Sequence, residues 1–219
     1  MTTSDRALAA ILWDFGGVLT TSPFEAFNRF EEERGLPKDF IRRVNATNPT
    51  DNAWARFESS LIDRDTFDVE FQAEAKALGH NVSGREVLRL LSGEVRPRMV
   101  AALDRCKSHY RVGCITNNVK TGSGPGMARD QQRASAVEAV MARFDVVIES
   151  SLEGVRKPDP AIYYLACDRM QVEPSACAFL DDLGINLKPA AALGMRTIKV
   201  VSEAQALADL TKLTGLSFD

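Results

Sequence analysis

The stretch "ILWDFGGVLTTS", residues 11–22, decides how the rest of the chain is arranged. It begins with residues that are apolar on both faces, which is typical of a central strand in a parallel sheet. Asp14 ends the run, and Gly16 and Gly17 then allow a tight turn. An aspartate in this place is often only a turn or cap residue, but it also begins the active site of many enzymes.

Beyond this strand the character of the chain changes twice. Residues 23–94 are rich in Phe, Glu and Arg at helical spacing, which predicts a small bundle of short helices. After them, helical segments alternate with short apolar strands, which predicts right-handed βαβ units and a parallel sheet. We therefore expect an α/β core made of residues 1–22 and 95–219, with residues 23–94 inserted as a second domain.

The composition narrows the class of protein. The chain has 219 residues with a formal net charge of −3, which suits one core with an insertion and argues against a general nucleic-acid binder. No apolar run is long enough to span a bilayer, and the first residues do not form a signal peptide. The four cysteines have no metal-binding spacing, which favours free thiols. We expect a cytoplasmic protein with neither nucleic-acid nor membrane partners.

Polar residues stand at the predicted carboxyl ends of the strands, where ligands bind in such sheets. The adjacent carboxylates after "AFL" favour a bound cation, because like charges side by side repel each other. Three carboxylates suit Mg²⁺, while a lysine, a hydroxyl and backbone N–H groups suit a phosphate. These candidate residues are Asp14, Thr116, Asn117, Asn118, Lys157, Asp181 and Asp182.

The order and spacing of these motifs resemble the haloacid dehalogenase superfamily of hydrolases. Within it, the chain is similar to the N-terminal phosphatase domain of soluble epoxide hydrolase and to related bacterial phosphatases. The resemblance implies a Rossmannoid sheet of strand order 5-4-1-2-3 with a helical cap inserted after the first motif, and it does not extend to epoxide hydrolysis. It is carried by "WDFGGVL" (13–19), "CITNN" (114–118), "GVRKPDPAIY" (154–163) and "FLDDLGINLKPAAALGM" (179–195).

The same resemblance implies a reaction and a set of roles. The reaction is Mg²⁺-dependent hydrolysis of a small phosphorylated metabolite through an aspartyl-phosphate. The implied catalytic residues are Asp14, Thr116 and Lys157. The implied phosphate contacts come from Phe15, Gly16, Thr116, Asn117 and Lys157. The implied metal ligands are Asp14, the Gly16 carbonyl, Asp181 and Asp182.

Gly16 departs from the pattern of the family. Most phosphatases in it carry a second aspartate there, which protonates the leaving oxygen, and such help is worth about 10²–10⁴-fold. Three hypotheses follow. The protein is a phosphatase whose leaving group needs little protonation or whose acid comes from the cap. Alternatively it resembles the 2-haloacid dehalogenases, which also lack this aspartate, or it is a non-catalytic module that binds a phosphorylated ligand.

Other residues allow two interpretations each. Trp54 and Arg56 either face the active site from the cap or, in the case of Trp54, belong to its core. Asn186 either supports the metal site or caps a helix. The glycine-rich stretch 122–126 is either a lid or a surface loop. His80 and His109 lie outside every motif, and we expect them in turns or on the surface.

Overall fold

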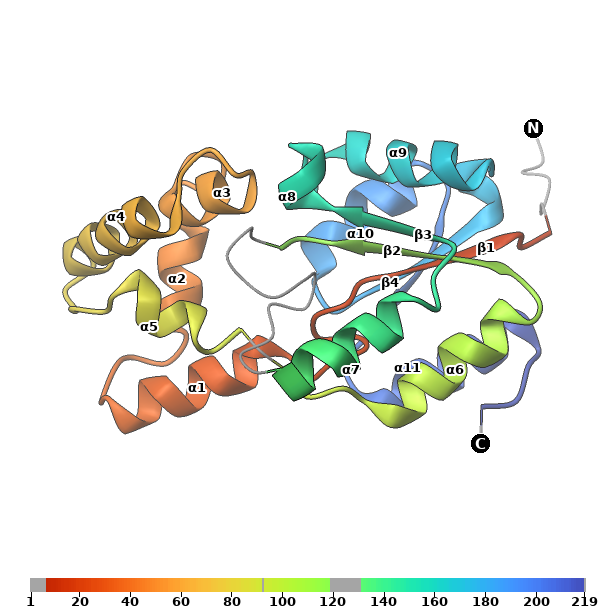
Figure 1. The fold of residues 1–219 in the computed structure, drawn as a ribbon, viewed down its shortest axis with the longest axis horizontal. Helices are drawn as coiled ribbons and strands as arrows, with labels where there is room; N and C mark the ends of the chain where they lie inside the picture. The colour runs from red at the N-terminus through yellow and green to blue at the C-terminus, as the bar shows by residue number, and fades with distance from the viewer. Residues whose placement is uncertain (1–6, 92, 119–130, 219) are drawn as a thin grey trace.

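The structure is a computed structural model that describes residues 7–91, 93–118 and 131–218. Five parallel strands form one sheet in the order β3-β2-β1-β4-β5 (Figure 1). This is the predicted order 5-4-1-2-3 read from the opposite edge, so the predicted fold is confirmed. The strands are β1 (Ala10–Trp13), β2 (Arg111–Thr116), β3 (Val146–Glu149), β4 (Cys177–Asp181) and β5 (Arg196–Lys199).

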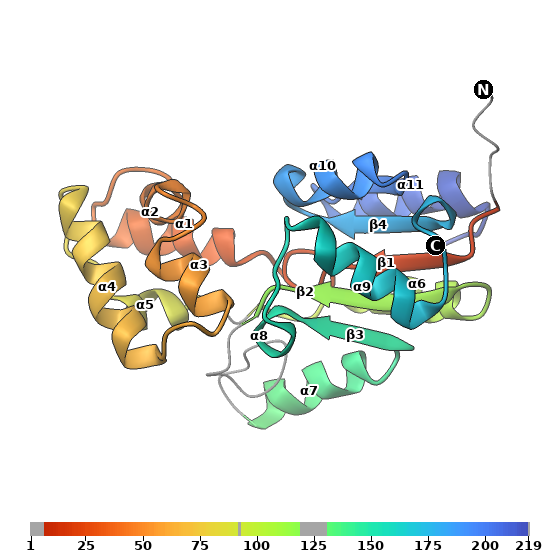
Figure 2. The same ribbon diagram turned by 90° about the horizontal axis from the view of Figure 1, so that it is seen from above.

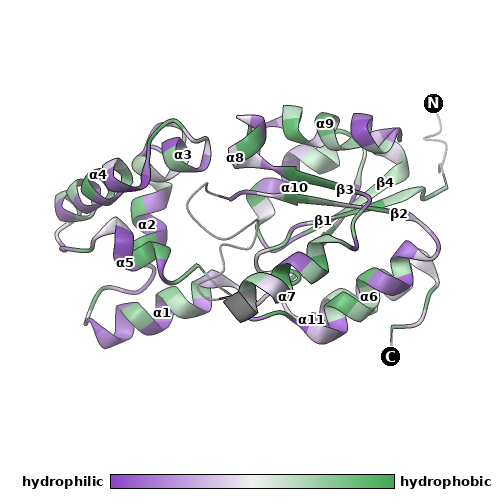
Figure 3. Ribbon diagram, viewed as in Figure 1, coloured by the Kyte–Doolittle hydropathy of each residue, from purple (hydrophilic) through white to green (hydrophobic). Residues whose placement is uncertain are grey.

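Helices cover both faces of the sheet (Figure 2). They are α6 (Pro97–Lys107), α7 (Gln131–Met141), α8 (Ser150–Glu153), α9 (Pro160–Met170), α10 (Gly184–Ala192) and α11 (Glu203–Thr214), with a short 3-10 turn, η1 (Pro174–Ala176). Ile11 and Trp13 of β1 contact the layer of α6, α7 and α11, whereas Ala10 and Leu12 contact the layer of α9 and α10. Burial on both faces explains why the central strands β1, β2 and β4 are mostly hydrophobic (Figure 3).

A second group of helices lies beyond the carboxyl ends of the strands (Figure 1). They are α1 (Pro23–Glu33), α2 (Phe40–Ala46), α3 (Ala53–Glu58), α4 (Arg64–Ala77) and α5 (Gly84–Leu88). They enclose an apolar cluster of their own, in which the rings of Phe57 and Phe67 stack with centroids 4.5 Å apart. We propose that residues 23–94 form the cap.

Two chain segments connect this helical group to the sheet, and they lie side by side. Thr20 and Val95 form an antiparallel bridge. Beside it, the N–H of Thr21 donates to the carbonyl of Glu94 at 2.8 Å. The chain therefore leaves the core and returns to it at neighbouring points.

Three further expectations can be compared with the structure. All four cysteines are buried and free, which agrees with the prediction of free thiols. In the part of the chain that the structure describes, no helix combines the length and the apolarity that crossing a membrane needs. The stretch 122–126 lies outside the described residues, so both interpretations of it stay predictions.

Candidate active site

Asp14 follows β1 directly, and its surroundings fix its carboxylate at the carboxyl end of this central strand. Its N–H donates to the carbonyl of Leu180 in β4 at 2.8 Å. Its Oδ1 accepts the N–H of Phe15 at 2.7 Å, and its Oδ2 lies 2.8 Å from Nζ of Lys157. The predicted nucleophile thus has one oxygen held by the following backbone and the other turned to the lysine.

Asp181, the last residue of β4, is fully buried beside Asp14. Nζ of Lys157 donates to its Oδ2 at 2.7 Å, so the lysine bridges the two carboxylates. The side-chain amide of Asn186 donates to both oxygens of Asp181, at 3.1 and 3.0 Å. Since α10 has Leu183 at its N-cap, Asn186 orients Asp181 and does not cap the helix.

The loop after β2 holds the lysine in place. The side-chain amide of Asn117 donates to the carbonyl of Lys157 at 3.0 Å and accepts its N–H at 2.9 Å. Thr116, which ends β2, is buried at the same edge. Asn118 donates its N–H to the Ser150 hydroxyl at 3.0 Å. Phosphate binding by Thr116 and Asn117 stays a prediction, and the structure adds a role for Asn117 in positioning the lysine.

The two glycines of "DFGG" differ in what their surroundings require. Gly17 has a left-handed φ of +77°, and a Cβ there would lie 2.2 Å from Oδ2 of Asp182. Only glycine allows that approach of the carboxylate to the backbone. Gly16 does not have a left-handed φ, and a Cβ on it would meet no atom within 4 Å. Space therefore does not explain the missing side chain at Gly16.

The site concentrates negative charge. Ligand atoms of Asp14, Asp181 and Asp182 lie within 4.8 Å of one another, and Lys157 contacts two of these residues. Burial raises the pKa of Asp14 well above its usual value; Lys157 opposes this shift, and the other two carboxylates add to it. Burial and then repulsion from Asp181 raise the pKa of Asp182 to about 6. Burial acts to lower the pKa of Lys157, but attraction to Asp14 and Asp181 outweighs it and raises this pKa.

These residues fit a hard divalent cation. Three carboxylates against one lysine leave a surplus of two negative charges when all four groups are ionised. Oxygen ligands are those that Mg²⁺ prefers, and a cation would relieve the repulsion that raises the two pKa values. The hydroxyl of Ser22 donates to Oδ2 of Asp182 at 3.2 Å and orients this carboxylate. Sequence reasoning missed Ser22, although it lies just after the first motif and caps α1.

Two of the cap residues considered above make contacts within the cap. The ring of Trp54 packs edge to face on Phe67, with centroids 5.8 Å apart. Arg56 forms an ion pair with Glu70 of α4 at 3.0 Å. Among the described cap residues, Glu58 and Ser60 contact the core, through Arg156 and the carbonyl of Ser151 respectively. Sequence reasoning missed Glu58 because neither a motif nor a periodicity marks it.

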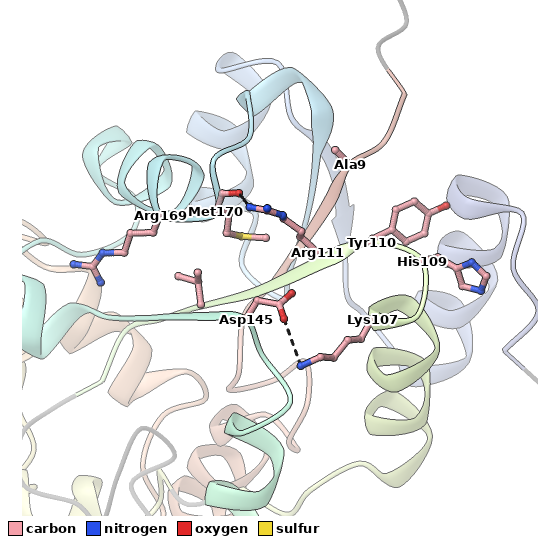
Figure 4. Close-up of a pocket in the computed structure, with 9 residues that line it drawn as sticks. Ala9, Lys107, His109, Tyr110, Arg111, Asp145, Arg169 and Met170 are labelled. Atoms are coloured by element: carbon pink, nitrogen blue, oxygen red, sulfur yellow. Dashed lines mark hydrogen bonds and ion pairs between the residues drawn. The ribbon is translucent and has the colours of Figure 1, made fainter.

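A cavity of about 650 Å³ lies at the amino ends of β1, β2 and β3, opposite to the end where the acidic cluster lies (Figure 4). Charged side chains line it, among them Lys107, Arg111 and Asp145. Lys107 pairs with Asp145 at 3.4 Å, and Arg111 donates to the carbonyl of Met170. The acidic cluster is at the other end of these strands, so this cavity is separate from the candidate active site.

The chain belongs to the haloacid dehalogenase-like hydrolase family, whose model matches residues 8–194. It is 32% identical to mouse acyl-CoA dehydrogenase family member 10 and 31% identical to mouse bifunctional epoxide hydrolase 2, with 96% and 97% of this chain aligned. It spans only 19% and 40% of those two longer proteins. A phosphatase of Mycobacterium tuberculosis is 27% identical, over 91% of this chain and 90% of that protein. The predicted resemblance is thus confirmed.

Solved structures share the fold. A family enzyme from Bacteroides thetaiotaomicron, in complex with magnesium and inorganic phosphate, superposes with a TM-score of 0.54 at 19% identity, covering 88% of this chain and 94% of that one. The L-2-haloacid dehalogenase of Xanthobacter autotrophicus, with chloropropionic acid covalently bound, superposes with a TM-score of 0.60 at 17% identity, covering 96% and 84%. At these identities the likeness shows the fold alone.

Proposed function

We propose that the protein is a Mg²⁺-dependent phosphatase that hydrolyses a small phosphomonoester through an aspartyl-phosphate on Asp14. One observation carries this proposal: Lys157 bridges Asp14 and Asp181, while Asp182 completes a cluster of three carboxylates. A nucleophilic carboxylate, a cation for phosphoryl oxygens and a set of oxygen ligands are the parts that this reaction needs.

Asp14, the carbonyl of Gly16, Asp181 and Asp182 are the proposed ligands of Mg²⁺. When bound, the ion would neutralise charge on the phosphoryl group and so favour attack by an anion. Lys157 is positioned for the same group, because its ammonium has three donors and lies against the nucleophile at 2.8 Å.

The reaction then consists of two successive substitutions at phosphorus, and residues of the chain assist both. A carboxylate oxygen of Asp14 attacks phosphorus, the bond from phosphorus to the ester oxygen breaks, and the alcohol leaves with a proton. Water next attacks phosphorus, the bond to Asp14 breaks, and inorganic phosphate leaves. Lys157, the Thr116 hydroxyl and the backbone N–H groups of Phe15, Gly16 and Asn117 hold the phosphoryl oxygens in both steps.

The relatives support this proposal over its alternatives. One relative, aligned over 90% of its own length and 91% of this chain, is a phosphatase. Displacement of halide from a 2-haloacid needs no divalent cation, so a cluster of three carboxylates suits a metal-dependent phosphatase better than a dehalogenase. The missing side chain at Gly16 is the observation that favours the dehalogenase hypothesis, and for this reason the test includes a haloacid.

The purified protein should be assayed with p-nitrophenyl phosphate, an alkyl phosphate and 2-chloropropionate, in Mg²⁺ and in EDTA. We expect phosphate release that requires Mg²⁺ and no halide release. Halide release that is unaffected by EDTA would instead identify a dehalogenase. The absence of turnover on every substrate, with a rise in melting temperature on adding inorganic phosphate and Mg²⁺, would identify a binding module.

A further inference from the structure

The proposed reaction needs a proton donor that Gly16 does not supply. Among the described residues of the cap, the buried acids are Glu31 and Glu58. Glu31 is used within the cap, because its two oxygens accept the N–H groups of Asp39 and Ile41 at 2.8 and 2.9 Å. This leaves Glu58 as the buried carboxylic acid that the cap turns toward the core.

Glu58 ends α3 and is anchored above the carboxyl edge of the sheet, where α3 faces α8 (Figures 1 and 2). Its carboxylate forms an ion pair with Arg156, the residue before Lys157. Its carbonyl accepts the Ser150 hydroxyl at 3.3 Å, and the same hydroxyl accepts the N–H of Asn118. The segment after β3, which carries Lys157, thus contacts Glu58 directly, and the loop after β2 is linked to it through Ser150.

We propose that Glu58 is the general acid and base of this enzyme, which deepens and rests on the proposed function. In the first step the protonated Glu58 gives its proton to the ester oxygen as the bond to phosphorus breaks and Asp14 becomes phosphorylated. In the second step the Glu58 carboxylate takes a proton from the attacking water. Phosphate leaves, and both carboxyl groups return to their starting states.

The surroundings of Glu58 suit both steps. The residue is 8% exposed. Burial raises its pKa, which favours the protonated form; Arg156, a hydrogen bond from Trp54 and the charge of Lys157 oppose this shift. Arg156 and Lys157 are therefore the charged groups that act on it. They stabilise the carboxylate that remains once the proton has been given away.

The test compares Glu58→Gln with Arg156→Gln on two esters in pre-steady-state experiments, with substrate in excess over enzyme and Mg²⁺ present. Nitrophenolate is a weak base and leaves without a proton, whereas an alkoxide is a strong base and must be protonated as it leaves. Glu58→Gln should slow release of the alcohol from an alkyl phosphate by about 10²–10⁴-fold. It should leave the nitrophenol burst nearly unchanged while slowing later turnover, because hydrolysis of the intermediate needs the base.

Arg156→Gln is the matched control, since it breaks the same ion pair but keeps the acid. It should slow both esters alike, and it should move the alkaline limb of the alkyl phosphate profile to higher pH, because the arginine lowers the pKa of Glu58. If Glu58→Gln alone does not fold, the double variant removes both charges and should show the same selective loss on the alkyl ester.

Two results would overturn this inference while leaving the phosphatase proposal intact. One is a wild type active on both esters with a Glu58→Gln variant that keeps its alkyl phosphate activity. The other is a loss in Glu58→Gln that is equal for both esters and for the burst, because Glu58 would then only hold the cap to the core. A wild type inactive on both esters would overturn the phosphatase proposal itself, and this inference with it.

Discussion

Replacing Asp182 by asparagine should stabilise the metal-free protein at alkaline pH and weaken its response to Mg²⁺. Burial and repulsion from Asp181 raise the pKa of Asp182 from 3.8 to about 6. That difference of about two units corresponds to about 3 kcal/mol. The folded state holds this proton more tightly than the unfolded state, so the wild type loses stability as pH rises from about 4 to about 6. Asparagine carries no charge and avoids the loss, while it can still accept the Ser22 hydroxyl.

Urea denaturation in EDTA would measure this difference at about pH 8 and about pH 4. Allowing for the partial solvent access of the carboxylate, we expect the Asp182→Asn variant to be about 2 kcal/mol more stable at the higher pH and nearly equal at the lower. Mg²⁺ at one hundred times its Kd should stabilise the wild type by about 2.7 kcal/mol and the variant by less. A variant that is less stable than the wild type at pH 8 in EDTA, or that gains as much from Mg²⁺, would refute the reasoning.

Three further predictions, one of them with a control variant, test the rest of the site. Asp14→Asn should abolish turnover with an unchanged circular dichroism spectrum, and more than trace activity would exclude the covalent mechanism. Gly17→Ala should lose at least about 1 kcal/mol of unfolding free energy, because its backbone is left-handed and its Cβ would clash with a carboxylate. Gly16→Ala, as its control, should show no such loss; equal effects in denaturation experiments would contradict the geometry. Asn117→Ala removes both hydrogen bonds to the backbone of Lys157 and should lower kcat/KM, and an unchanged value would show that the lysine needs no such support.

The sheet could be predicted because most of its strands are recognisable from their local sequence. The strands β1 to β4 contain short apolar runs bounded by polar residues, and the predicted strand order follows from the family resemblance. Within the cap, glycine, proline or asparagine interrupts the helical spacing at residues 35–37, 48–49 and 79–81, and α1, α2 and α4 end just before these positions. No such signal marks the break between α3 and α4, because "SSLID" (59–63) contains neither glycine nor proline and turns through Ser60 with a φ of 58°.

The site could be predicted only in part, for a physical reason. Asp14 and Asp181 stand at strand ends, so the topology alone brings them to one edge. The contacts of Asn117 with Lys157 join residues 40 positions apart, and the hydrogen bond between Ser150 and Glu58 joins residues 92 apart. Such pairs depend on how loops and cap pack together, and no local pattern encodes them.

The bridge between Thr20 and Val95 has a consequence for how this architecture diversifies. The chain leaves the core and returns to it at adjacent points. For the sheet, the whole inserted bundle is therefore equivalent to one loop whose two ends are already held together. Closing a longer or shorter loop changes the chain entropy only slowly with its length. We infer that insertions, deletions and repacking within the bundle leave the sheet undisturbed, whereas exchange of the whole bundle would also remove Glu58, so that a new module would have to bring its own acid and base.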